Sequence, residues 1–234
     1  MKGFSWLNRR TPSLDDVQRQ RLDALPGMAG GEAPLREQRF VVLDLETTGL
    51  NTSRDLVLAI GAVVIDDGAI QLGQQFERTL QRDNHQVSES VLIHGIGPGA
   101  VAAGSDPAGA LLDFLEFLGD SPLLAFHAPF DQRMLARALK HSLGHRLVHP
   151  FIDLAELAPL LFPQANIRQG GLDDWIAHFG LQVQQRHNAS ADALATAELA
   201  LILFSHARRQ GLDSFVQLEQ RLASWRRRQR AHSL

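Results

Sequence analysis

The pattern of apolar residues predicts that the main fold begins near residue 40 and opens with three strands. The six residues from Phe40 are apolar apart from Asp44, which is typical of a strand buried on both faces. Residues 57–66 are rich in β-branched side chains and run into Asp66-Asp67-Gly68, a strong hairpin-turn signal. Residues 69–80 are expected to return alongside them, so that the three segments form an antiparallel meander.

Beyond residue 80 the apolar positions recur mostly with helical spacing. One more short strand is expected over residues 122–126, and the expected helices cover residues 107–118, 131–143, 154–161, 172–179, 189–210 and 213–229. Strands followed by alternating helix and strand are typical of a mixed sheet with helices packed on it. We therefore expect an α/β fold with a central mixed sheet of about five strands, three of them antiparallel.

The segment before the first strand has a different character. Ser13 is a plausible cap for a helix that ends before Pro26-Gly27, and a Gly- and Pro-containing stretch follows it. We therefore expect an N-terminal helical extension and linker over residues 1–38, a main domain over residues 39–210, and a C-terminal basic helix over residues 211–234. The extension is expected to pack on the main domain or to pair with another subunit.

Composition limits the chemistry that this chain can perform. The 234 residues include no cysteine, which excludes disulfides, thiolate nucleophiles and thiolate zinc sites. The formal net charge is −3, so the molecule as a whole is not a general binder of polyanions. The sequence has neither the apolar core of a signal peptide nor a run approaching the ~20 apolar residues of a membrane span. We expect a cytoplasmic protein that makes no membrane contact.

Two carboxylates stand at the end of the first expected strand. Asp44 and Glu46 are two residues apart, so in a strand they face the same way, and Thr47-Thr48-Gly49 follows them. Like charges this close need something positive between them, and hard oxygen ligands suit Mg²⁺ or Mn²⁺. Chance alone predicts roughly 0.7 such pairs in this chain, so the pair in isolation fits a solvated strand end as well.

Two further segments place polar groups at helix starts. Asp131 follows the apolar strand and turn that end in Phe130, where it could be either a helix cap or a third acidic ligand. His187 comes just before a long expected helix, and Asp192 lies in its first turns. That spacing can bring an imidazole and a carboxylate over one site, although a lone histidine here is more often a surface or capping residue.

Together these segments resemble the DEDDh branch of the DnaQ-like 3′–5′ exonuclease family, which includes the proofreading epsilon subunit of bacterial DNA polymerase III. The matching stretches are DLETTGL at residues 44–50, HAPFD at residues 127–131 and HNASAD at residues 187–192. Supporting matches lie at residues 93–96, 152–155, 161–163 and 172–181. The resemblance covers about residues 38–205, and the combination is far more specific than any one piece.

The resemblance implies a ribonuclease-H-like fold and a site for two Mg²⁺ (or Mn²⁺). Asp44 would bridge the two cations, Glu46 and Asp192 would complete one of them, and Asp131 would serve the other. His187 would be the general base on the attacking water, and a histidine can titrate near neutral pH. The substrate-binding residues implied for the terminal nucleotide are Thr47, Thr48, Gly49, Leu50, His94 and Phe130.

The implied reaction is hydrolysis of phosphodiesters at a 3′ end to release nucleoside 5′-monophosphates. Single-stranded DNA is the first expected substrate and RNA the second, because both kinds of exonuclease share these site residues. A polymerase partner is possible, and the sequence leaves the oligomeric state open. Two other classes stay open: a non-catalytic nucleic-acid-binding accessory module, and a two-metal enzyme acting on mononucleotides.

Two smaller features have competing interpretations. His127 occupies a position where many members of the family have Asn, and we interpret it as a neutral variant rather than a functional group. Five arginines at positions 221, 226, 227, 228 and 230 form a basic C-terminal end. This end could be a phosphate-contacting stripe, but from the sequence alone a solvated helix end is the better interpretation. Trp6 and Trp225 are expected to be packing residues.

Overall fold

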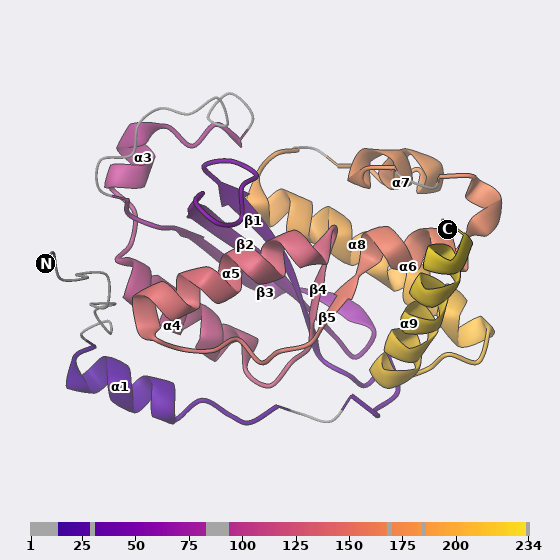
Figure 1. Cartoon of the computed structure of the whole chain (residues 1–234), viewed down its shortest axis with the longest axis horizontal. Coiled ribbons are helices and arrows are strands. Elements are labelled where there is room, and N and C mark those ends of the chain that lie inside the picture. The colour runs from indigo at the N-terminus through magenta and orange to yellow at the C-terminus, as the bar shows by residue number, and fades with distance from the viewer. Residues whose placement is uncertain (1–13, 29–30, 83–93, 168–169, 184–185, 233–234) are drawn as a thin grey trace, which may run out of the picture.

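A five-stranded mixed sheet organises the protein (Figure 1). The structure is a computed structural model, and it describes residues 14–28, 31–82, 94–167, 170–183 and 186–232. The strands are β1 (Phe40–Thr47), β2 (Val57–Asp66), β3 (Ala69–Thr79), β4 (Leu123–Ala125) and β5 (Phe151–Asp153), in the spatial order β3-β2-β1-β4-β5. β1, β2 and β3 pair antiparallel, and β4 and β5 continue parallel to β1. The expected α/β fold and its mixed sheet are confirmed.

The helices lie on both faces of this sheet. They are α1 (Asp16–Asp23), α3 (Pro98–Ala102), α4 (Pro107–Leu118), α5 (Ala128–Leu143), α6 (Leu154–Leu161), α7 (Leu172–Phe179), α8 (Ala189–Arg209) and α9 (Phe215–His232), with a 3₁₀ turn, η1 (Pro163–Ala165). The expected start of α5 at Asp131 was wrong by three residues, because Pro129 fits the first turn of a helix, where no N–H is needed. Within the described ranges, no helix combines the length and the apolar character that crossing a membrane requires.

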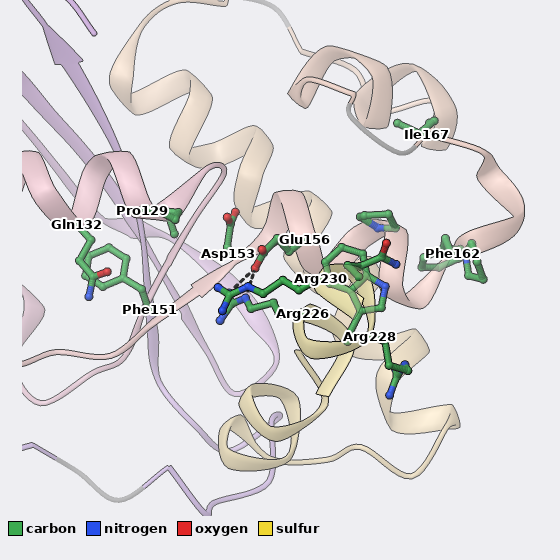
Figure 2. Close-up of a pocket in the computed structure, with 15 residues that line it drawn as sticks. Pro129, Gln132, Phe151, Asp153, Glu156, Phe162, Ile167, Arg226, Arg228 and Arg230 are labelled. Atoms are coloured by element: carbon green, nitrogen blue, oxygen red, sulfur yellow. Dashed lines mark hydrogen bonds and ion pairs between the residues drawn. The ribbon is translucent and has the colours of Figure 1, made fainter. Parts of the chain in front are cut away.

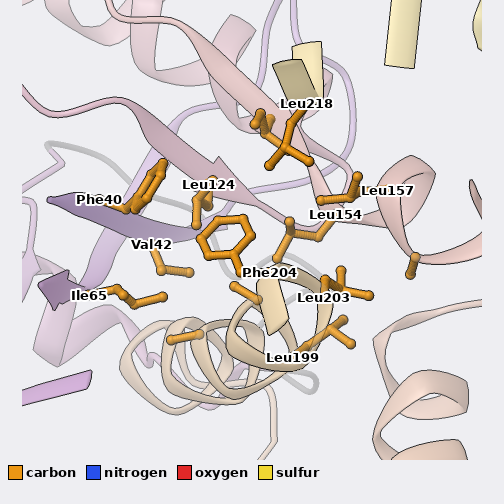
Figure 3. Packing of buried hydrophobic residues seen from close by; sticks show 14 of the residues in the cluster. Phe40, Val42, Ile65, Leu124, Leu154, Leu157, Leu199, Leu203, Phe204 and Leu218 are labelled. Carbon is orange, nitrogen blue, oxygen red and sulfur yellow. The ribbon is translucent and has the colours of Figure 1, made fainter. Parts of the chain in front are cut away.

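Alternation along β1 divides the core into two clusters. Phe40 and Val42 face a cluster that α6, α7, α8 and α9 complete, whereas Val41 and Leu43 face a cluster that α4 and α5 complete. Figure 3 shows the first cluster, in which side chains from β1, β2 and β4 meet side chains from α6, α8 and α9. Full burial of a large apolar side chain stabilises a fold by about 1.5–3 kcal/mol, so these two layers hold the sheet between the helices.

Both ends of the described chain are fastened to this core. α1 begins after Asp15, which caps it, and Ser13 lies outside the described residues. Arg21 of α1 contacts Asp113 and Glu116 of α4, each at 2.7 Å, so the extension packs on the main domain. At the other end, the Leu35 N–H donates to the Asp213 carbonyl at 3.0 Å, which holds the start of α9 against the linker.

Candidate active site

The first two carboxylates come from the central strand. Asp44 and Glu46 lie on one face of β1, both half-buried, and β1 has neighbours on both sides in the sheet. In the register with β2, Asp44 pairs with Gly61 and Glu46 pairs with Ala59. The site therefore begins at a rigid part of the sheet.

A glycine in β2 allows the long helix α8 to reach these carboxylates. A Cβ at Gly61 would lie 2.1 Å from the carbonyl carbon of Ala189 and 2.3 Å from the nitrogen of Ser190, so the first turn of α8 rests on the strand backbone. Because Gly61 is the partner of Asp44, this close approach delivers Asp192 beside Asp44 and Glu46. One ligand oxygen from each of these three carboxylates lies within 4.8 Å of the others.

The fourth carboxylate, Asp131, is buried in the first turn of α5. It is not part of the 4.8 Å group, but it is close enough for its charge to raise the pKa of Asp44. Hydrogen bonds with its own backbone and with that of Leu45 attach it to β1 and lower its pKa in part. The structure thus brings Asp44, Glu46 and Asp192 together and places Asp131 behind them.

Burial and mutual repulsion favour the protonated form of this cluster. Burial is the main cause that raises the pKa values of Asp44, Glu46 and Asp131. Repulsion from Asp131 and Glu46 raises the pKa of Asp44 further, and Asp153 adds to the effect at Asp131. Four carboxylates in one place are costly without a positive charge between them.

Arg186 supplies positive charge to this cluster, and the sequence interpretation missed it. Its guanidinium contacts the Asp192 carboxylate directly and donates from Nε to Asp173 at 2.5 Å. It also lowers the pKa values of Asp44 and Glu46, against the effect of burial. An arginine at this position belongs to no recognisable motif. Its place directly before His187 was the one feature of the sequence that could have pointed to it.

His187 lies at the edge of the site rather than inside the carboxylate group. Its side chain is exposed, its backbone has a φ of 61°, and its N–H donates to Asp192 Oδ2 at 3.1 Å. Asn188 then caps α8 by accepting a hydrogen bond from the Ala191 N–H at 3.1 Å. The backbone of His187 is thereby fixed to a carboxylate of the cluster, while its ring faces solvent.

His127 has a structural explanation. It precedes α5 with a φ of 62° and a ψ of 43°, in the left-handed region, and its N–H donates to Asp153 Oδ1 at 3.0 Å. Asn and His are both enriched among non-glycine residues that adopt this backbone conformation. A histidine can therefore stand where many members of the family have Asn without any change in the turn.

A pocket of about 590 Å³ opens beside Glu46, and the six expected substrate-binding residues all line it. These are Thr47, Thr48, Gly49, Leu50, His94 and Phe130. Asn51, Arg54 and Asp55 also line it, and none of these three was expected. Leu50 is 86% exposed, so among the described residues an apolar side chain stands largely uncovered at the rim of the pocket.

The donor set of the carboxylate group fits a hard divalent cation. All the candidate ligands are carboxylate oxygens, the class that Mg²⁺ and Mn²⁺ prefer, and no thiol is available in the chain. The group also has the excess negative charge that a bound cation would neutralise. The residues present are therefore those of a metal site of the kind that the sequence resemblance implies.

Comparison with known proteins supports the resemblance to exonucleases. A family model described as exonuclease (RNase_T) matches residues 41–200. The chain is similar to the PolC-type DNA polymerase III of Bacillus subtilis (strain 168), at 29% identity over 189 residues, and to a DNA polymerase III subunit epsilon-like protein of Rhodobacter capsulatus, at 32% identity over 188 residues. These alignments cover 80% and 79% of this chain but only 13% and 26% of the two relatives.

Solved structures support the fold. E. coli exonuclease I in complex with a dT13 oligonucleotide matches 74% of this chain and 42% of that chain, with a TM-score of 0.60 and 19% identity. Exonuclease X in complex with a 5′-overhanging duplex matches 71% of this chain and 91% of that chain, with a TM-score of 0.57 and 23% identity. At these low identities, the likeness shows a shared arrangement of sheet and helices.

Replacing Gly61 by alanine is expected to push α8 away from β2 and to separate Asp192 from the other carboxylates. Overpacking of this kind costs about 1–3 kcal/mol, and each kcal/mol lowers the Tm of a chain this size by about 2–4 °C. Scanning calorimetry should show a lower Tm and a smaller rise of Tm with Mn²⁺. Gly73→Ala is the control, because a Cβ there meets nothing within 4 Å. Equal behaviour of the two variants would contradict this role of Gly61.

Asp44→Asn is expected to stabilise the metal-free protein, and more so at pH 8 than at pH 5. The folded-state pKa of Asp44 is raised, so the wild type loses stability as the pH rises from the unfolded-state pKa through the folded one. The amide removes that loss, and each kcal/mol recovered is worth about 2–4 °C in Tm.

The measurement is the Tm in EDTA at both pH values, with Asp23→Asn as the control for an exposed carboxylate. An Asp44→Asn protein no more stable than the wild type at pH 8 would show that repulsion in the cluster is already relieved.

Proposed function

This chain belongs to the exonuclease family whose model matches its residues 41–200, and we propose that it is a 3′–5′ exonuclease that releases nucleoside 5′-monophosphates from DNA. The observation that carries the proposal is the meeting of Asp44, Glu46 and Asp192 within 4.8 Å, next to a pocket lined by residues 47–50. We assign the catalytic domain to residues 39–210, the extension to residues 1–38 and the basic helix to residues 211–234.

The four carboxylates would hold two divalent cations, Mg²⁺ or Mn²⁺. Asp44 is proposed as the shared ligand, with Glu46 and Asp192 on one side and Asp131 on the other. Two such cations can stabilise the attacking and leaving oxygens of an in-line displacement. The carboxylates would hold the cations at the end of β1. Arg186 contacts Asp192 Oδ1, so this contact would have to break for that oxygen to bind a cation.

The pocket beside Glu46 would hold the terminal nucleotide. Phe130 offers an aromatic face to a base, and the exposed Leu50 side chain would gain burial by covering the other face. Hydrogen bonds inside the loop keep its shape: Thr47 Oγ1 donates to the Gly49 carbonyl at 2.9 Å, and Thr48 Oγ1 accepts from the Leu56 N–H at 2.9 Å. A preformed loop positions the sugar and its 3′-OH over the carboxylates.

His187 is proposed as the general base. Its backbone is attached to Asp192, so a change of side-chain rotamer can swing the exposed ring over the cluster. There a neutral ring nitrogen would accept a proton from the attacking water. The proposal requires that this proton transfer limits the rate.

DNA is favoured over RNA by the relatives. The similar proteins are named DNA polymerase III proteins, and the similar structures contain DNA. The same names make a DNA polymerase the partner to test. Discrimination against RNA would depend on how the pocket treats the 2′-OH.

The direct test is time-resolved digestion of matched 5′-labelled single-stranded DNA and RNA, with Mg²⁺, Mn²⁺ or EDTA. We expect a ladder that shortens from the 3′ end, faster on DNA, present with either metal and absent with EDTA. Asp192→Ala should abolish it while the protein stays folded, because a ligand is lost. Cleavage only within the strand would contradict the proposed polarity, and failure to cut either oligonucleotide would contradict exonuclease activity.

His187→Ala is expected to lower kcat by about 10²–10⁴ if the ring is the general base. The measurement is the pH–rate profile of the variant against the wild type, with His141→Ala as the control for an exposed histidine on α5. Loss of the acidic limb of the profile together with the rate would support the assignment. A variant whose profile keeps the shape of the wild type would remove His187 from this role.

A further inference from the structure

Figure 2 shows a second and larger depression in the structure. Its volume is about 1140 Å³, and it runs between the start of α5, the end of β5, α6 and the last turns of α9. We call it the α9 groove. The residues of α9 that line it are Trp225, Arg226, Arg228, Gln229 and Arg230.

α9 is a fixed wall of this groove. Phe215, Leu218 and Leu222 are buried in the same apolar cluster as β1 and α8. Farther along, Arg226 Nε donates to Glu156 Oε2 of α6 at 2.6 Å, the pair drawn with dashed lines in Figure 2. These contacts hold the basic turns of the helix over the groove, which a merely solvated helix end would not require.

The groove presents positive charge and an aromatic ring in a chain whose net charge is −3. Residues 221–230 contain five arginines and no acidic residue. Of the two acidic residues that line the groove, Glu156 is paired with Arg226, and Asp153 accepts hydrogen bonds from two backbone N–H groups. Arg228 and Arg230 also line the groove and are exposed, so they add positive charge to its surface.

The first turn of α5 connects the groove with the candidate active site. Phe130 lines the 590 Å³ pocket that also contains Glu46, whereas the preceding residue, Pro129, lines the α9 groove. Asp131 comes next along the chain and is buried against β1. A polymer with its end in the pocket thus needs to cross only this turn to enter the groove.

We propose that the α9 groove binds the phosphodiester backbone of a nucleic-acid single strand whose 3′ end occupies the pocket. Arginine side chains would contact phosphates, and Trp225 would offer a face on which a base can stack, the combination that single-strand sites use. This inference rests on the proposed function. It assigns binding of the strand to α9, which lies outside the residues 41–200 that the family model matches.

The test compares two double variants that remove the same charge from the same helix. Arg228→Ala/Arg230→Ala removes charge from the groove, whereas Arg221→Ala/Arg227→Ala removes exposed arginines that do not line it. The probe is a 5′-fluorescein-labelled dT20, and its binding is followed by fluorescence anisotropy in EDTA, so that no cleavage is needed.

We expect the groove variant to bind more weakly than the control pair at 50 mM salt, and the ratio of their Kd values to fall by about sevenfold between 50 and 200 mM salt. Each phosphate contact on a single strand contributes about 0.7 to the slope of log K against log salt, so the loss of two contacts changes the slope by about 1.4 and the affinity ratio by about sevenfold between 50 and 200 mM. Equal losses for the two pairs, or no binding by the wild type, would overturn the proposal.

The outcome is separable from that of the proposed function. A wild-type protein that binds dT20 through the groove but cuts no oligonucleotide with Mg²⁺ would refute the exonuclease activity and leave the groove assignment intact. Conversely, 3′–5′ digestion with equal binding losses for the two pairs would uphold the activity and refute the groove.

Discussion

The first turn of α8 rests directly on the backbone of β2, because position 61 is a glycine. The rest of the site depends on this contact. Asp44 and Glu46 belong to the sheet and are fixed by its hydrogen bonds, but Asp192 belongs to a helix more than a hundred residues farther along. A single methyl group at position 61 would occupy the space of the helix backbone. The approach of the two backbones thus brings Asp192 into one group with Asp44 and Glu46.

The proximity of these carboxylates creates repulsion between them, and Arg186 partly offsets it. Burial and repulsion raise the pKa values of Asp44, Glu46 and Asp131, so the metal-free site opposes its own ionisation. The Arg186 guanidinium offsets part of this from the segment that also carries His187. A cation bound at this group would compete with the Arg186 guanidinium for the Asp192 carboxylate.

The sequence predicted those parts of the fold that have long and regular signals. β2, α4, α6 and α7 have the expected bounds, because each has a clear apolar pattern between turn residues. β5 was not placed, because only two apolar residues precede Asp153 there, whereas the three residues of β4 stand in a longer apolar run over residues 122–126.

The same division holds for the site. The carboxylates were identified by their positions at strand ends and helix starts, and by their resemblance to a known family. Gly61 and Arg186 were not identified, because close backbone approach and an ion pair across a loop leave no local pattern. The groove could not be expected either, since it is formed by α5, α6 and α9 together. From the sequence alone, a solvated helix end was the better interpretation of the five arginines.

Charge is distributed unevenly over the two depressions, and this unevenness suits the strand binding proposed above. At the cluster a nucleic acid is repelled unless cations are present. At the α9 groove the arginines would attract it whether or not cations are bound. The first turn of α5 separates the two regions by a single residue step, from Pro129 to Phe130. Attraction to the strand and chemistry at its end can therefore be altered independently, because different helices carry them.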